Sequence, residues 1–323
     1  MLQHMAKDSS IPSLVRDFSL PVAGEFYYVD LAAGSDSNNG SDWDNAFLTV
    51  NNAYDAVEAD GNDYVIVRGW KTETGTGIIN TLDVAQTHLI GHAGILNPYT
   101  PEKGSMYRSG AGDAPHTNIT AEFVEVAGLS FVATQGAGIE SASVSKGSLQ
   151  TGTYAADGGN KAYIHNCQFP DWSSAATTTG ITVTGSHYGI LRDIYIENIY
   201  GNIDAGVYLS GGASANPSLM TFENIVFRGG GGAATAVIEL YSGAGSLQNS
   251  TINGLYGTRV TNMISLGTAY GAYCSIDNAV GDMLENSFFA GGSACDARDD
   301  LWTNYKWSAG GNVWGRDAIL AAT

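Results

Sequence analysis

A six-residue pattern recurs along the chain, and it constrains the possible folds more than any other feature of the sequence. Its clearest copy is Phe222–Phe227, in which apolar residues surround one acid and a central Asn. The centre of every copy is Gly, Asn or Asp, residue types that tolerate a left-handed backbone or bond to the backbone locally. The pattern therefore predicts short strands joined by bends. Five further stretches share it: Val126–Phe131, Ile164–Phe169, Leu191–Ile196, Leu247–Ile252 and Leu284–Phe289.

The spacing of these copies indicates a stacked, repetitive fold. Neighbouring centres are 25 residues apart at the closest (Asn224 to Asn249) and 38 at the widest (Gly128 to Asn166), a period typical of solenoids. We therefore predict an all-β protein, a parallel solenoid with inward apolar columns; the alternative is a β-sandwich whose strands happen to align. A second apolar column follows the centres: Ile181–Val183, Val207–Leu209, Ile238–Leu240 and Ile264–Leu266. The central residues are expected to stack as a structural ladder: Asn166, Asp193, Asn224, Asn249 and Asn286.

The stretch before the repeats has the pattern of a cap. A strand at Phe26–Val29 and a long turn at Gly34–Asp44 precede a helical period over Ala46–Glu58, with Asp44 as the expected N-cap. The run from Phe26 to Gly69 resembles the N-terminal cap and first coil of right-handed parallel β-helix proteins of the pectate-lyase-like superfamily, which includes phage tailspikes and virion fibres. The resemblance implies a right-handed parallel β-helix with an N-terminal capping helix and an extended N-terminal arm. It is not specific for activity, because the superfamily mixes lyases, glycosidases, epimerases and non-enzymatic fibres.

The resulting domain organisation has four parts. Residues 1–24 are expected to form an assembly arm, 25–60 the cap, 61–294 the β-helix with side loops at about 97–118 and 141–160, and 295–323 a Trp-rich C-terminal cap. Extended loops on rigid scaffolds are where binding usually resides. The residues predicted to serve assembly or binding are Phe18, Leu20, Trp302, Trp307 and Trp314.

Charge and cysteine content exclude several classes of function. The formal net charge of -18 argues against nucleic acid and anionic membranes, and less firmly against strongly anionic polysaccharides. The chain has no apolar run of about 18 residues for a transmembrane helix, and its start lacks the apolar core of a signal peptide. Three widely spaced cysteines, Cys167, Cys274 and Cys295, indicate neither a disulfide framework nor a zinc site.

The sequence shows no complete catalytic constellation. Asp204, in an Asn-x-Asp element similar to that of polygalacturonase-type glycosidases, and Glu223 are the candidate catalytic acids, but neither has a recognisable second carboxylate. A lyase would need an Arg or Lys base in a recognisable motif, and we find none. No cofactor is expected. Calcium is the one candidate metal, with Asp36, Asp42 and Asp44 as oxygen ligands, although a plain capping turn explains these three acids as well.

The function expected from these observations is a non-enzymatic component of a virus particle. It would be a bacteriophage spike, fibre or capsid decoration protein, made in the cytoplasm, displayed on the virion surface, and anchored to other virion proteins through residues 1–24. The resemblance to tailspikes implies a homo-oligomer, a trimer, that binds polysaccharide on the host surface. The alternative is a polysaccharide lyase or glycosidase (a depolymerase) acting on bacterial or algal polysaccharide. A third interpretation is a carbohydrate-binding adhesin that uses aromatic residues such as Tyr195, Tyr208 and Trp302.

Overall fold

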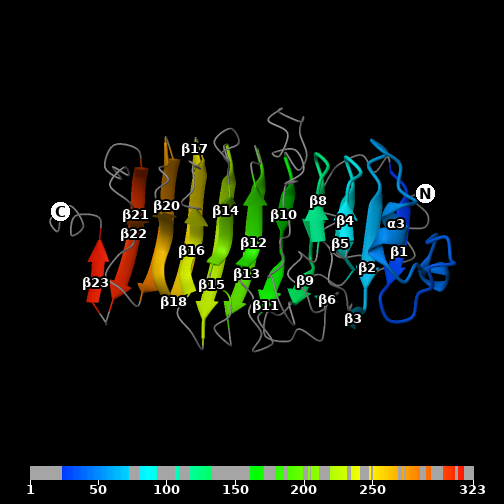
Figure 1. Ribbon diagram of the computed structural model, residues 1–323, viewed down its shortest axis with the longest axis horizontal. Coiled ribbons are helices and arrows are strands. Elements are labelled where there is room, and N and C mark those ends of the chain that lie inside the picture. Colours follow the sequence, from blue (N-terminus) through cyan, green and yellow to red (C-terminus); the bar gives the residue numbers. More distant parts are fainter. Residues whose placement is uncertain are drawn as a thin grey trace.

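The structure, a computed structural model, is mostly β with very little helix. It describes residues 24–72, 80–92, 106–108, 117–132, 161–170, 179–184, 188–198, 203, 205–210, 219–230, 234–240, 247–248, 250–267, 271–272, 274–283, 289–291, 301–309 and 312–315. Figure 1 shows the strands stacked along the long axis, from β1 beside helix α3 at one end to β23 at the other. Neighbouring strands within this stack are separated in sequence by whole repeats.

Three rows of parallel strands form most of the stack. The first row pairs in this order: β1 (Phe26–Asp30), β2 (Tyr64–Arg68), β5 (His88–Gly91), β8 (Glu125–Ala127), β10 (Tyr163–His165), β13 (Ile190–Asn198), β15 (Thr221–Gly229), β18 (Thr251–Gly267), β20 (Cys274–Met283) and β22 (Leu301–Ala309). The second row is β3 (Trp70–Thr72), β6 (Met106–Arg108), β9 (Ser130–Val132) and β11 (Gln168–Pro170), which joins β13. The third is β12 (Thr179–Thr184), β14 (Ala205–Ser210), β16 (Ala234–Leu240), the end of β18, and β21 (Phe289–Gly291).

Short pairs complete the sheets. β4 (Asn80–Leu82) pairs with β7 (Thr117–Ile119), and β17 (Leu247–Gln248) with β19 (Gly271–Ala272), both in parallel. β23 (Asn312–Gly315) runs antiparallel to β22. A long sheet of parallel strands whose neighbours are one repeat apart is compatible with a parallel β-helix, as the repeat pattern predicts. The described residues contain no helix long and apolar enough to cross a membrane.

The core lies between the rows and follows the period-2 alternation of the strands. In the first row the inward side chains are fully or almost fully buried: Val65, Leu89, Val126, Ile164, Leu191, Phe222 and Ile252. The predicted second apolar column is confirmed, because Ile181, Val207, Ile238 and Ile264 pair in succession across β12, β14, β16 and β18. Burial of these apolar columns is the main stabilising contribution to the stack.

The cap differs from the expected long helix. It consists of a 3-10 turn, Trp43–Asn45, and a short helix, α3 (Val50–Tyr54), whose N-cap is Thr49 rather than Asp44. The Asp36 carboxylate explains the late start, because it accepts hydrogen bonds from the amides of Leu48 and Thr49 at 3.0 and 2.9 Å and holds them outside the helix. Buried side chains of α3 pack on the first coil of the core.

The bend centres adopt the predicted left-handed backbone. Asn166, Asp193 and Asn224 have φ angles of 51°, 52° and 52°, and Gly128 occupies the same position at 67°. The Asn224 side-chain amide donates to the Asp193 carboxylate on the preceding coil at 2.9 Å. These residues form a ladder of bends along the sheet edge.

Beyond Asn224, the residue that continues the ladder differs from the predicted one. The register pairs Glu223 with Asn253 and Ile225 with Leu255, so Gly254 (φ 76°) and not Asn249 lies beside Asn224. The alignment of Leu247–Ile252 with the pattern was therefore wrong by five residues. Strand β18 begins only at Thr251, and apolar residues on both sides of Gly254 satisfy the same inward alternation. Asn249 and Asn286 themselves lie outside the described residues.

Several predicted regions are not described or differ in detail. The arm residues Phe18 and Leu20 and the loop at 141–160 lie outside the described residues. The expected loop at 97–118 contains β6 and the start of β7. The three tryptophans of the C-terminal region lie on strands, Trp302 and Trp307 on β22 and Trp314 on β23.

We predict that Asn224→Leu lowers the free energy of unfolding by about 1–2 kcal/mol, because a branched side chain is unfavourable in the left-handed region. Loss of the hydrogen bond to Asp193 adds to this effect. Urea denaturation followed by circular dichroism measures it. Asn224→Gly, which suits a positive φ, is the control and should lose clearly less; equal stability of the Leu variant and the wild type would contradict the ladder.

Candidate functional site

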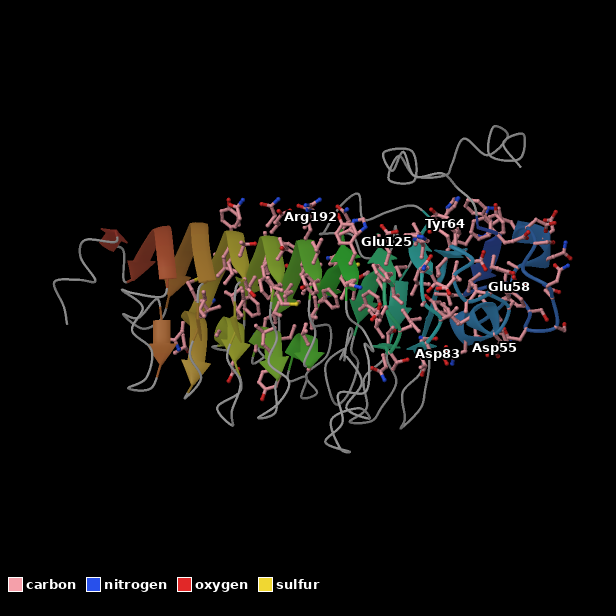
Figure 2. All side chains as sticks on the ribbon, turned by 90° about the horizontal axis from the view of Figure 1, so that it is seen from above. Asp55, Glu58, Tyr64, Asp83, Glu125 and Arg192 are labelled. Carbon is pink, nitrogen blue, oxygen red and sulfur yellow. The ribbon has the colours of Figure 1, made fainter. Side chains whose placement is uncertain are left out.

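Strands β5, β8 and β10 bring one acid and two histidines together on the outer face of the first row. The register aligns His88 with Glu125 and Glu125 with Tyr163, while His165 lies two residues beyond Tyr163. Their neighbours Leu89, Val126 and Ile164 point inward, so alternation directs this set outward. Figure 2 shows Tyr64, Glu125 and Arg192 at successive places along this face.

The Glu125 carboxylate joins the two histidines. Its Oε2 lies 2.5 Å from His88 Nδ1, and its Oε1 lies 2.6 Å from His165 Nε2. All three side chains are buried although they lie on the outer face. A buried carboxylate is costly unless it is paired and hydrogen-bonded, and here both oxygens have a donor. We call Glu125, His88 and His165 the His–Glu–His cluster.

Each histidine of the cluster has a second polar partner at its other ring nitrogen. Asn166 Nδ2, which can only donate, is 2.8 Å from His165 Nδ1, so this nitrogen accepts. His88 Nε2 is 3.0 Å from the Asn62 carbonyl oxygen, Oδ1, and its Nδ1 faces the carboxylate. Each nitrogen of His88 therefore faces an oxygen atom, Oε2 of Glu125 or Oδ1 of Asn62.

Aromatic rings enclose the cluster at both ends. Tyr64 stacks on His88 with ring centroids 4.2 Å apart, and Phe26 stacks on Tyr64 at 5.0 Å. On the other side Tyr163 stacks on His165 at 4.0 Å. These rings cover the faces of the two histidines, and hydrogen bonds in such a low-dielectric setting are strong and costly to lose.

The protonation of Glu125 reflects opposing effects. Burial by itself would raise the pKa of the carboxyl group, but the hydrogen bonds from His165 and His88, together with the charge of the histidines, outweigh it and lower the pKa to about 2. Glu125 thus stays ionised over the whole range in which proteins normally work.

Two members of the cluster, His88 and Glu125, line a pocket of about 420 Å³. Lys161 lies at its wall, with Nζ 4.2 Å from the centroid of the Phe123 ring and 3.5 Å from the Glu122 carboxylate. A pocket that combines aromatic walls with convergent ionisable groups is a good candidate for a binding or active site. The residues that line it are Asn62, Gln86, His88, Phe123, Glu125, Lys161 and Tyr163.

Tyr163 links the pocket to the next coils. Arg192 on β13 donates from Nη1 to the Tyr163 hydroxyl at 3.2 Å, and its Nε binds Glu223 on β15. Burial raises the pKa of Tyr163 above its usual value, although the Arg192 charge acts in the opposite direction. The phenol therefore keeps its proton at neutral pH.

None of the predicted site residues that the structure describes lines this pocket. Glu223 is paired with Arg192, and Asp204 lies outside the described residues. Asp36 and Asp42 accept hydrogen bonds within the cap turn, and Asp44 is part of the 3-10 turn. Among the described residues, no group of three or more His, Cys, Asp or Glu side chains is arranged to hold a metal ion.

Sequence reasoning missed Glu125 entirely and found no partner for either histidine. One signal was present: His165 occupies the water-facing position of the repeat, and Glu125 lies just before the copy that begins at Val126. The His88 coil does not show the six-residue pattern, so its register could not be read from the sequence. Only pairing of β5 with β8 reveals that His88 lies beside Glu125.

Comparison with known proteins finds little similarity. No family model and no curated protein matches the chain. A solved structure described as a rhamnogalacturonan lyase matches with a TM-score of 0.41 and 12% identity over 87% of each chain. The match contradicts the expected role as a non-enzymatic virion component, because the matched protein is an enzyme and nothing found points to a virus particle. At this TM-score the match assigns no activity to the chain, which has to be argued from the site.

We predict that Glu125→Gln lowers the free energy of unfolding at pH 7 by about 1.5–3 kcal/mol, the usual value of hydrogen bonds to a charged group. Since the pKa of Glu125 is lowered from 4.5 to about 2 on folding, its contribution is present above pH 4.5 and is lost as the pH falls towards 2. The stability difference between the variant and the wild type should shrink over that window. Urea titrations at pH 7 and at pH 3 measure it, and a difference that is independent of pH would rule out the ionised cluster.

Proposed function

We propose that the protein is a polysaccharide-degrading enzyme built on a right-handed parallel β-helix, and that it cleaves a uronate-containing chain by β-elimination. The observation that supports this most is the pocket, in which Lys161 and Tyr163 lie beside His88 and the ionised Glu125 of the His–Glu–His cluster. Perturbed ionisable groups that converge in a pocket are typical of catalytic sites.

The composition of the pocket favours elimination over hydrolysis. Glycosidases need two carboxyl groups facing one bond, roughly 5 to 10 Å apart. Among the described residues that line the pocket, Glu125 is the one carboxylate, and both of its oxygens are bound by histidine. An elimination instead needs a proton acceptor and a proton donor, and the pocket contains a lysine and a phenol.

In this scheme Lys161 accepts the proton from the carbon next to the uronate carboxyl group. The electrons of that bond form a carbon–carbon double bond, and the glycosidic oxygen departs with the electrons of the broken carbon–oxygen bond. Tyr163, which burial keeps protonated, donates a proton to the departing oxygen. Arg192, whose guanidinium donates to the Tyr163 hydroxyl, supplies positive charge that favours negative charge on the substrate.

The acidity of the whole chain does not prevent this. Interactions between exposed charges are largely screened beyond about 8 Å at physiological ionic strength. A uronate in the pocket is therefore affected mainly by the groups nearest to it, among them Arg192, rather than by the overall charge of -18.

The direct test is incubation with polygalacturonan, rhamnogalacturonan, alginate and xylan. We expect ultraviolet absorbance from new double bonds on a uronate-containing chain, together with shortening of the chain, and no reaction with a xylan that lacks uronate. Shortening without double bonds would show hydrolysis and would contradict elimination. Absence of any cleavage across the panel would count against the enzyme itself.

We predict that Lys161→Met and Lys161→Arg both lower kcat by about 10²–10⁴, the usual contribution of a general base. Arginine keeps the positive charge but cannot release its proton in a protein, so it separates proton transfer from binding. Initial rates of double-bond formation measure the effect. A Lys161→Arg variant with activity close to the wild type would show that the lysine acts only through its charge.

A further inference from the structure

A second column of left-handed residues runs along the strands of the first row. Each member lies two residues before the start of a strand and has a φ between 55° and 59°. We call this set the leading column: Asn62 before β2, Gln86 before β5, Phe123 before β8, Lys161 before β10, Tyr188 before β13 and Leu219 before β15.

The members of the leading column are stacked neighbours. The backbone amide of the first residue of these strands donates to a backbone carbonyl on the preceding coil. That carbonyl belongs to the residue directly after the column member. For example, Tyr163 donates to Val124 and Ile190 donates to Ala162, both at 2.9 Å. Since coils stack about 4.8 Å apart, Phe123 and Tyr188 are separated by about 10 Å, with Lys161 between them.

The side chains in this column are unusual for their backbone. Asn and Gly tolerate a left-handed backbone, whereas bulky residues adopt it rarely. Yet three of the four large hydrophobic side chains that are exposed among the described residues belong to the column: Phe123 at 47%, Tyr188 at 56% and Leu219 at 40%. Exposed apolar side chains contribute little to the core, and backbone strain of this kind is concentrated at functional sites.

The column also continues the pocket. Asn62, Gln86, Phe123 and Lys161 line the pocket wall, while Tyr188 and Leu219 lie beyond it in the direction of β15. Rings that alternate with the polar side chain of Lys161 suit the amphipathic faces of sugars, whose C–H groups pack on aromatic surfaces while their hydroxyls stay hydrated.

We propose that the leading column is a binding track for an extended polysaccharide, which leaves the pocket at Phe123 and stacks on Tyr188 before it reaches Leu219. This inference rests on the proposed function for the identity of the ligand. The substrate is then a polymer that binds over several coils along the long axis. Phe123 and Tyr188 determine which chain length the protein prefers.

The test uses Phe123→Asn and Tyr188→Asn, singly and together. Asparagine removes the ring and is suited to the left-handed backbone. The control is Tyr256→Ala, which removes an exposed aromatic side chain outside the column. Binding is measured by affinity gel electrophoresis in polygalacturonan, rhamnogalacturonan or alginate, and cleavage by double-bond formation.

We expect the removal of each ring to weaken binding about tenfold. For Tyr188→Asn this should appear as a higher KM with kcat little changed. Phe123→Tyr and Tyr188→Phe should restore binding, and Tyr256→Ala should behave as the wild type. The melting temperature of the Asn variants should stay equal or rise, because strain is removed. A marked fall would identify a structural role and overturn the track.

The remaining outcomes separate the two proposals. Normal cleavage and binding by the double variant would overturn the track and leave the enzyme proposal intact. Retention of the protein in a polysaccharide gel that depends on the two rings, without cleavage of that polysaccharide, would overturn the enzyme proposal and support the track. No retention of the wild type in any of the gels would overturn the track. A change of oligomeric state in the variants on size-exclusion chromatography would show an interface between copies and also overturn it.

Discussion

Parallel backbone pairing from coil to coil sets the position of every side chain described above. Each inward apolar residue, such as Leu89 or Val126, must fall on the same column as its counterpart in the next coil. A slip of one residue would turn the whole strand inside out. The register is therefore strongly specified, and left-handed residues at both ends of the short strands allow the chain to turn without breaking it.

The side chains of the outer face follow the same register, although they do not pack in the core. At β5, β8 and β10 this face carries the His–Glu–His cluster, which is buried between aromatic rings. Burial of the Glu125 carboxylate costs free energy, and the hydrogen bonds from the two histidines offset that cost. Replacing a buried, fully bonded charge with apolar side chains is often neutral or stabilising for a fold, so its presence beside an open pocket is better explained by function.

Sequence reasoning succeeded for the repeats and failed for the chemistry, for related reasons. The second apolar column was predictable because burial selects residue type at every position from Ile181 to Ile264. The alignment at Leu247 failed because Leu255 and Ile252 offered an equally good apolar alternation five residues later. The virion role was inferred from the lack of a catalytic motif, but the site that the structure shows joins residues 37 and 40 positions apart on different coils. No linear motif could represent it.

By itself the sequence determined a stacked β architecture, its bend positions and most of its core, because alternation and the tolerance of Asn and Gly for left-handed bends are local properties. It also contained the phenol, lysine, histidines and exposed rings. Only the tertiary structure decided that His88, Glu125 and His165 meet, that Glu223 is paired with Arg192 elsewhere, and that Phe123 and Tyr188 share a column. Those relations depend on the lengths of the loops between coils. Loop length cannot be read from the local pattern, so the relative position of two residues on different coils is fixed only when the strands pair.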